Sequence, residues 1–83
     1  MKIQIRYFAA LREALGPTET VELPAGSTLA ALREQLLASS PRHAAVLARG
    51  RAVRCALNQV MSDESVPVPE GAEVAFFPPV TGG

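Results

Sequence analysis

Cysteine and long apolar runs are scarce in this chain of 83 residues, and each scarcity excludes a class of protein. Because Cys55 is the only cysteine, the chain can form no internal disulfide, no cysteine-rich zinc site and no iron–sulfur cluster held by its own thiolates. No apolar run approaches the roughly 20 residues of a membrane span, and the opening MKIQIRYF alternates where a signal peptide would be continuously apolar. We therefore expect a cytoplasmic protein with no metal site and no membrane partner.

An excess of charge is also absent, because 8 basic residues balance 8 acidic residues. Without net positive charge the chain has no general attraction for nucleic acids, so we expect specific protein partners and no nucleic acid. The sequence also lacks the glycine-rich loops that cradle nucleotide phosphates. Any nucleotide-dependent step therefore belongs to another protein, and we expect no bound cofactor.

The most specific pattern in the chain is its C-terminal sequence, VAFFPPVTGG. Pro78 and Pro79 fix φ and lack a backbone N–H, so no strand or helix continues past Phe77. At this length the chain has room for one domain. We therefore divide it into a folded domain over residues 1–77 and an extended tail over residues 78–83.

Two glycines, Gly82 and Gly83, end that tail. Without a Cβ, their backbone fits a slot too narrow for other residues and can present the terminal carboxylate to another protein. A frayed terminus would also tolerate two glycines, but here they follow an aromatic strand and a proline pair. A carboxylate is a poor electrophile and must become an acyl-adenylate before sulfur or an amine can attack it. We interpret the carboxylate of Gly83 as the reactive group, activated by an ATP-using partner.

The spacing of apolar residues predicts the order of secondary structure. Alternation predicts strands over residues 2–8, 18–23, 52–57 and 73–77, with short edge pairing at 60–61 or 66–68. Helical spacing and end signals predict helices over residues 9–15, 28–38 and 43–47. The shared core is expected to contain Ile3, Ile5, Leu29, Leu32, Leu36, Val53, Leu57 and Val74. This order predicts an α+β fold in which a mixed sheet wraps around one main helix, with the last strand beside the first.

Few side chains suggest chemistry of their own. His43 has no partner at metal-ligand spacing, so a surface or packing role is expected for it. Cys55 lies on the apolar side of its strand, so a packing role is expected there. Phe76 and Phe77 must face opposite sides of a strand, so one enters the core and the other is a candidate for a partner's pocket. Arginine is in local excess in one part of the chain, at Arg42, Arg49, Arg51 and Arg54. This group is either a solvated face or a docking surface for an acidic partner.

Over its full length the chain resembles the small subunits of molybdopterin synthase (MoaD), a family of ubiquitin-like β-grasp sulfur carriers. The resemblance is carried by YFAALREALG at 7–16, STLAALRE at 27–34, ALNQ at 56–59 and, most specifically, GAEVAFFPPVTGG at 71–83. It implies a β-grasp fold and a non-catalytic subunit whose catalytic residues lie on a separate large subunit. It also implies a heterotetramer of two small and two large subunits.

The resemblance further implies a reaction at the chain end. Gly83 would be adenylated by an E1-like enzyme that consumes ATP, and a sulfur donor protein would supply the sulfur of a thiocarboxylate. That sulfur would pass to cyclic pyranopterin monophosphate in the large subunit, with Gly82 giving clearance. Contacts with the large subunit are implied for Phe76, Phe77, Pro78, Pro79, Val80 and Thr81.

Three other functions are compatible with a Gly-Gly terminus. A sulfur carrier of the thiamine pathway would share the fold and the chemistry, although the sequence FFPPVTGG favours the molybdopterin interpretation. A ubiquitin-like modifier would use the same adenylate to form isopeptide bonds with lysines of other proteins. A plain interaction domain would carry an inert tail.

Overall fold

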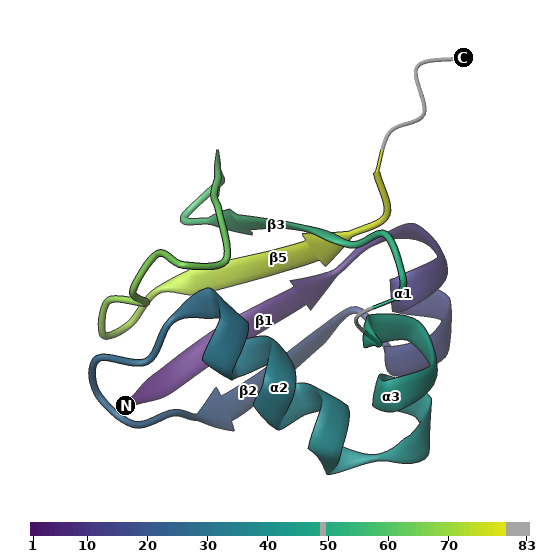
Figure 1. Ribbon diagram of the computed structural model, residues 1–83, viewed down its shortest axis with the longest axis horizontal. Helices are drawn as coiled ribbons and strands as arrows, with labels where there is room; N and C mark the ends of the chain where they lie inside the picture. Colours follow the sequence, from purple (N-terminus) through teal and green to yellow (C-terminus); the bar gives the residue numbers. More distant parts are fainter. Residues whose placement is uncertain (49, 80–83) are drawn as a thin grey trace.

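A computed structural model describes residues 1–48 and 50–79, and within them the strands form one mixed sheet in the order β2-β1-β5-β3-β4 (Figure 1). The strands are β1 (Lys2–Tyr7), β2 (Thr18–Glu22), β3 (Arg54–Leu57), β4 (Val60–Met61) and β5 (Glu73–Phe77). The helices are α1 (Ala9–Leu15), α2 (Leu29–Ser39) and α3 (Pro41–Leu47). No helix in the described ranges is long and apolar enough to cross a membrane.

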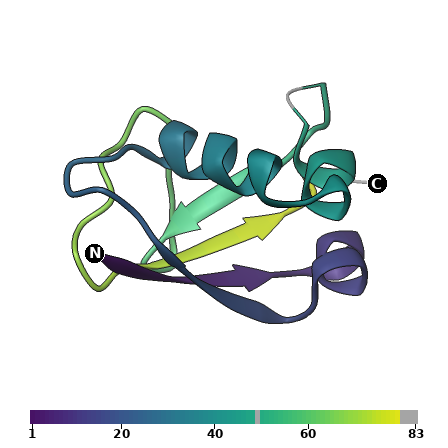
Figure 2. The ribbon, with the colours of Figure 1, turned by 90° about the horizontal axis from the view of Figure 1, so that it is seen from below.

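The last strand, β5, lies in the middle of the sheet. It runs parallel to β1, where Ile5 is level with Val74, and antiparallel to β3 on its other side. Strand β2 pairs antiparallel with the outer edge of β1. Helices α2 and α3 cover one face of the sheet, while α1 lies at the end where β1 finishes (Figure 2). The expected α+β fold, with a mixed sheet around one main helix, is confirmed.

The core forms where the inward face of the sheet meets α2. Ile3, Ile5 and Tyr7 alternate inward along β1, and almost no part of their side chains is exposed. The stripe on α2 is buried as expected, at Leu29, Leu32 and Leu36. Val53 and Leu57 were also expected in the core, but they are only partly buried and pack against its rim. Both lie near the ends of β3, so solvent reaches them from the side.

The predicted elements at 2–8, 18–23 and 28–38 differ from the structure by one residue at one or both ends, and three other segments differ more. The strand expected over residues 52–57 begins only at Arg54, because the preceding loop turns back through a hydrogen bond from Arg51 N to Ala48 O at 2.8 Å. The helix expected over 43–47 begins two residues earlier, because Ser40 accepts a hydrogen bond from His43 N and Pro41 suits the first helical turn. The 66–68 segment adds an isolated bridge, whereas the edge pairing at 60–61 forms β4.

Replacing Leu32 with alanine is expected to lower the free energy of unfolding by about 2 to 5 kcal/mol. The side chain is fully buried between α2 and the sheet, so its removal leaves a cavity in a small core. Urea unfolding followed by circular dichroism measures the change. Gln35→Ala on the exposed side of the same helix is the matched control, with an expected cost below about 1 kcal/mol. Equal midpoints for the parent and Leu32→Ala would contradict this placement of the stripe.

Candidate functional site

The candidate site is the point where the chain leaves the sheet. Strand β5 ends at Phe77 and continues into Pro78 and Pro79, which lack the N–H needed to extend the ladder. Because β5 lies between β1 and β3, the chain leaves from the middle of the sheet (Figure 1). We call residues 77–79 the tail root. The roles expected for Val80, Thr81, Gly82 and Gly83 fall on residues outside those that the structure describes.

The two phenylalanines before the prolines have different environments. Phe76 is 1% exposed and its ring stacks on that of Tyr7, with centroids 6.4 Å apart. Phe77 follows it on the opposite face and is only partly buried. Phe76 is therefore a core residue, which corrects the expectation that it contacts a partner. Of the two candidates, Phe77 alone faces outward.

Helices α2 and α3 leave one face of the sheet uncovered, and we call this the open face. On the open face, Phe77 is surrounded by apolar side chains. Ala56 pairs with both Ala75 and Met61, so these three side chains lie in one row across the open face. Phe8 continues the alternation of β1 and also points outward, and it is 40% exposed while Met61 is 58% exposed. Small alanines in the centre and larger side chains at the rim give the open face a shape that can accept another protein.

Charged side chains border the open face. Arg54 is the register partner of Phe77, so it lies beside the tail root. The Arg6 guanidinium carbon lies 5.7 Å from the centroid of the Phe8 ring, and Arg6 also faces Glu73 at 3.9 Å. The Arg6–Glu73 pair is half exposed, so its contribution to stability is small. The face therefore combines an apolar centre with a margin that carries Arg54 and the Arg6–Glu73 pair.

A polar network behind the tail root was not predicted from the sequence. The Tyr7 hydroxyl donates to Glu19 Oε2 at 2.8 Å, and the same oxygen lies 2.8 Å from His43 Nε2. Burial, and then the hydrogen bond to Glu19, raise the pKa of Tyr7, so the phenol stays a donor. Ser40 Oγ contacts the other ring nitrogen of His43 at 2.6 Å. Of the two roles expected for His43, surface or packing, the structure supports packing, because the side chain is 14% exposed and lies in this network. The network holds Tyr7 against Phe76.

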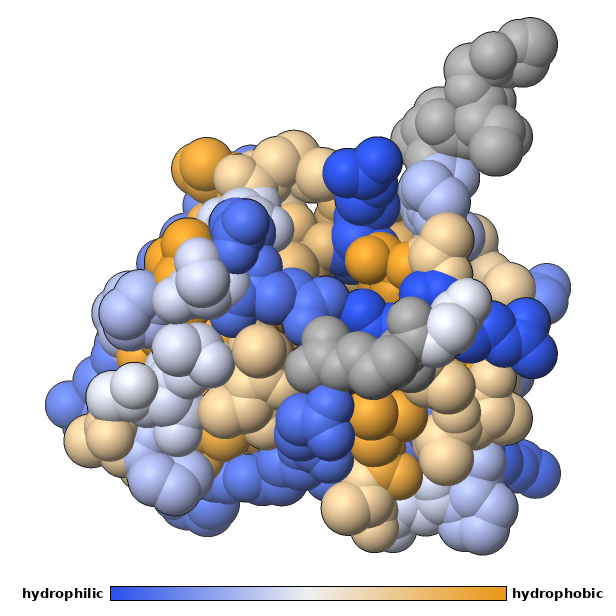
Figure 3. All heavy atoms as spheres, in the orientation of Figure 1, coloured by the Kyte–Doolittle hydropathy of each residue, from blue (hydrophilic) through white to orange (hydrophobic). Residues whose placement is uncertain are grey.

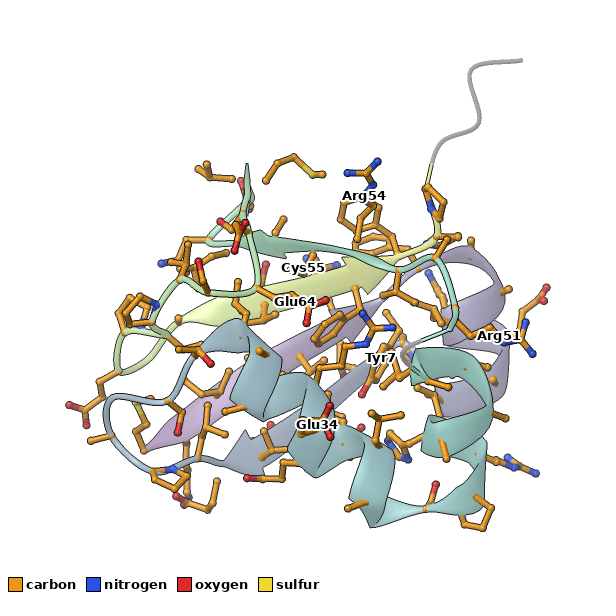
Figure 4. The ribbon with its side chains drawn as sticks, in the orientation of Figure 1. Tyr7, Glu34, Arg51, Arg54, Cys55 and Glu64 are labelled. Carbon is orange, nitrogen blue, oxygen red and sulfur yellow. The ribbon has the colours of Figure 1, made fainter. Side chains whose placement is uncertain are left out.

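Cys55 is buried beside a cavity of about 380 Å³. The cavity is lined by Val53, Arg54, Cys55, Met61, Ser62, Asp63 and Glu64. The thiol donates to Ser62 O at 3.4 Å, and burial, reinforced by Glu64, raises its pKa (Figure 4). A protonated, buried thiol is a poor nucleophile, so the expected packing role is confirmed. In the described part of the chain, no three His, Cys, Asp or Glu side chains are grouped to hold a metal ion.

Arg33 on α2 is a buried cation that sequence reasoning missed. It is 4% exposed, and each of the three guanidinium nitrogens donates at least one hydrogen bond. The acceptors are Leu47 O at 2.7 Å, Glu64 Oε2 at 2.7 Å, Ala48 O at 2.8 Å and Arg51 O at 3.2 Å. Arg33 lies four residues after Leu29 and so falls on the same helix face as the apolar stripe. That spacing was the one feature of the sequence from which its burial could have been predicted. Arg33 thus ties α2 to the end of α3 and to the loop that leads into β3.

Arg33→Met is expected to lower the free energy of unfolding by about 3 to 5 kcal/mol. The substitution keeps an apolar stem of similar length but removes the hydrogen bonds that Arg33 donates to three carbonyls and to the Glu64 carboxylate; of the three carbonyls, Ala48 O keeps the bond from Arg51 N. Thermal unfolding measures the loss. Arg12→Met on the exposed side of α1 is the matched control and should change stability by no more than about 0.5 kcal/mol. Similar melting temperatures for both variants would show that the buried contacts contribute little.

These features define a ubiquitin-like β-grasp domain whose central strand leads into a C-terminal tail. The chain belongs to the ThiS family, whose profile matches residues 5–83. It is 43% identical over 82 residues to the "Molybdopterin synthase sulfur carrier subunit" of Escherichia coli strain K12, covering 98% of this chain and 99% of that protein. The family resemblance seen in the sequence is therefore confirmed.

Solved structures share the fold. The putative molybdopterin converting factor, subunit 1, from Pyrococcus furiosus has a TM-score of 0.80 at 27% identity, and 96% of this chain matches 99% of that one. A subunit in the Helicobacter pylori complex of subunits 1 and 2 of molybdopterin-converting factor has a TM-score of 0.70, with full coverage of both chains. At 24% identity, this second likeness is evidence for the fold.

Proposed function

We propose that this chain is the sulfur carrier subunit of molybdopterin synthase and that the carboxyl group of Gly83 carries the sulfur. The observation that supports this best is the position of β5, which leads from the middle of an open sheet face into a proline pair. A rigid domain is thereby connected to a tail that ends in Gly82 and Gly83. The name of the Escherichia coli relative, which matches along the whole chain, supports the pathway.

The chemistry occurs at the terminal carboxyl carbon. Its carboxylate attacks the α-phosphate of ATP in an activating enzyme, which releases pyrophosphate and leaves an acyl-adenylate. A hydrosulfide-level sulfur supplied by the donor protein then attacks the acyl carbon, AMP departs with the bonding electron pair, and loss of the sulfur's proton leaves the thiocarboxylate. Cys55 is unsuited to supply that sulfur, because its thiol is buried and its pKa is raised. The activating enzyme thus consumes the ATP, and this chain holds no cofactor. The proposed location is a reducing cytoplasm.

The large synthase subunit is the proposed receiving protein. Phe77 and the open face would dock against it, while Pro78 and Pro79 hold the tail extended. Val80 and Thr81 would thread the channel, and Gly82 would pass its narrowest part. The catalytic residues would belong to the large subunit, in an assembly of two small and two large chains. The complex of the two subunits from Helicobacter pylori supports a partner of this kind.

The test is an intact-mass measurement on the purified chain after incubation with ATP, the activating enzyme and a sulfur donor. We expect a mass change in which sulfur replaces one terminal oxygen. Addition of the large subunit and cyclic pyranopterin monophosphate should then return the chain to its original mass as molybdopterin forms. Conjugates between Gly83 and lysines of other proteins, without sulfur loading, would instead support a protein modifier.

A further inference from the structure

Arginines are more numerous at the tail-root end of the sheet, although the chain has no net charge. That end also carries Glu13 and Glu19, and the opposite end carries Lys2. Helices α1 and α3 and the loop before β3 lie at the end where β5 finishes (Figures 1 and 2). Exposed arginines from these segments and from the start of β3 are Arg12, Arg42, Arg51 and Arg54. The opposite end carries Glu22 at the end of β2, with Glu70 and Glu73 near the start of β5. The basic excess thus lies at the end of the tail root.

Two of these residues, Arg51 and Arg54, lie in the loop and strand next to the tail root, and we call them the tail-root arginines. Figure 4 shows Arg54 beside the last described residues, and Figure 3 shows hydrophilic surface bordering the same place. Both side chains are exposed, and neither forms an ion pair with the residues that the structure describes. Arg6 and Arg33 differ, because each faces a glutamate of its own chain.

The backbone that carries Arg51 is held in place from inside the domain. The Arg33 guanidinium donates to Ala48 O and to Arg51 O, and Arg51 N donates to Ala48 O. Arg54 is held by its place in β3, next to the central strand. A partner therefore meets these two cations on backbone that is already held by hydrogen bonds at Arg51 and by the sheet at Arg54, so less entropy is lost on binding.

We propose that the protein surface around the slot that receives the tail presents carboxylates to Arg51 and Arg54. This inference rests on the proposed function, which makes the receiving protein the large subunit of molybdopterin synthase. A tail that inserts fully brings the tail root against the mouth of the slot. The two arginines then lose water without an ion pair in the described chain. Asp63 and Glu64 line the same cavity as Arg54 but lie beyond ion-pair distance from it, so carboxylates of the partner must compensate the two cations. Carboxylates there also accelerate and orient the encounter.

The test compares the association rate of the large subunit with the parent chain, with the double variant Arg51→Glu and Arg54→Glu, and with controls. Lys2→Glu and Arg42→Glu, placed together, make the same change in net charge at exposed positions outside the tail root. Stopped-flow fluorescence is recorded from about 0.01 M to about 1 M salt, over which the Debye length falls from about 30 Å to about 3 Å. Circular dichroism establishes that every variant is folded.

At low salt we expect the double variant to associate about tenfold or more slowly than the parent, and the control variant to change about twofold or less. The difference should vanish at high salt. Equal rates for the parent and the double variant would overturn the inference, as would equal losses in the double variant and the control. Parent chain that does not bind the large subunit at any salt concentration would contradict the proposed function and the inference with it. Binding of a single-stranded RNA by the parent, lost in the double variant, would assign the arginines to nucleic acid instead.

Discussion

Deletion of Gly83 is expected to abolish sulfur loading while the domain stays folded. The shortened chain still ends in a carboxyl group, on Gly82, but its reach is shorter by one residue, about 3.5 Å, so that group does not reach the reacting atoms of the activating enzyme. No side chain of the domain substitutes for the carboxyl group of Gly83. Extension of the chain by a C-terminal tag should have the same effect, because it converts that carboxyl group into an amide. Intact mass after incubation with ATP, activating enzyme and sulfur donor measures loading, and thermal unfolding shows that the core is unchanged.

Two further variants separate the carrier group from its surroundings. Cys55→Ser should load sulfur like the parent, because the Cys55 thiol is buried, donates to Ser62 O and has a raised pKa, so it is a poor nucleophile. Gly82→Val should keep the carboxylate but slow the transfer, because a branched side chain restricts the backbone and widens the segment that enters the slot. Loading that survives the loss of Gly83, or that disappears with Cys55→Ser alone, would be incompatible with the mechanism.

The sequence predicted the arrangement of the domain because local patterns and chain order were consistent with each other. Alternation along 2–7 and the stripe at Leu29, Leu32 and Leu36 each identify one buried face, and both faces are buried in the structure. The central position of β5 followed from the fold class. Boundaries were less accurate near Arg54, because a hydrogen-bonded loop replaced the first part of that predicted strand.

The polar contacts could not be predicted because they join residues far apart in the sequence. Glu19 lies on β2 and His43 on α3, yet both meet Tyr7 behind Phe76. Arginine is a good helix former that usually lies on the surface, so helix propensity gives no reason to expect Arg33 to be buried. Only the folded structure shows the carbonyls that accept its hydrogen bonds. Such contacts depend on tertiary geometry, which apolar periodicity does not encode.

The choice between the two phenylalanines links the fold to the proposed docking. Their alternation was evident from the sequence, but the face that each occupies depends on the register of β5 with β1 and β3. Because Tyr7 is level with Phe76, the inward side of β1 continues across β5 at that position. Phe77 is therefore left on the open face, next to Arg54 and two residues before the end of the described chain.

Phe77→Asp is expected to abolish co-elution of the chain with the large subunit. Loss of a central aromatic contact typically costs about 2 to 4 kcal/mol of binding free energy, and an unpaired carboxylate in the interface adds to that loss. The sum corresponds to at least a hundredfold weaker binding, at about 1.4 kcal/mol for each factor of ten. The isolated domain should stay folded, because Phe77 lies outside the buried core. Size-exclusion chromatography of the mixed subunits measures the complex.

Controls at Phe77 and at a second position on the same face distinguish docking from a general effect of charge. Phe77→Ala removes the ring without adding a charge, so it should weaken the complex less than Phe77→Asp does. Thr18→Asp adds the same charge to β2, which is separated from β5 by β1, at an exposed position level with Arg6. We expect Thr18→Asp to co-elute like the parent. A complex that survives Phe77→Asp would place the interface away from the open face. In this strand register the new carboxylate lies on the open face, where a docked protein would bury it.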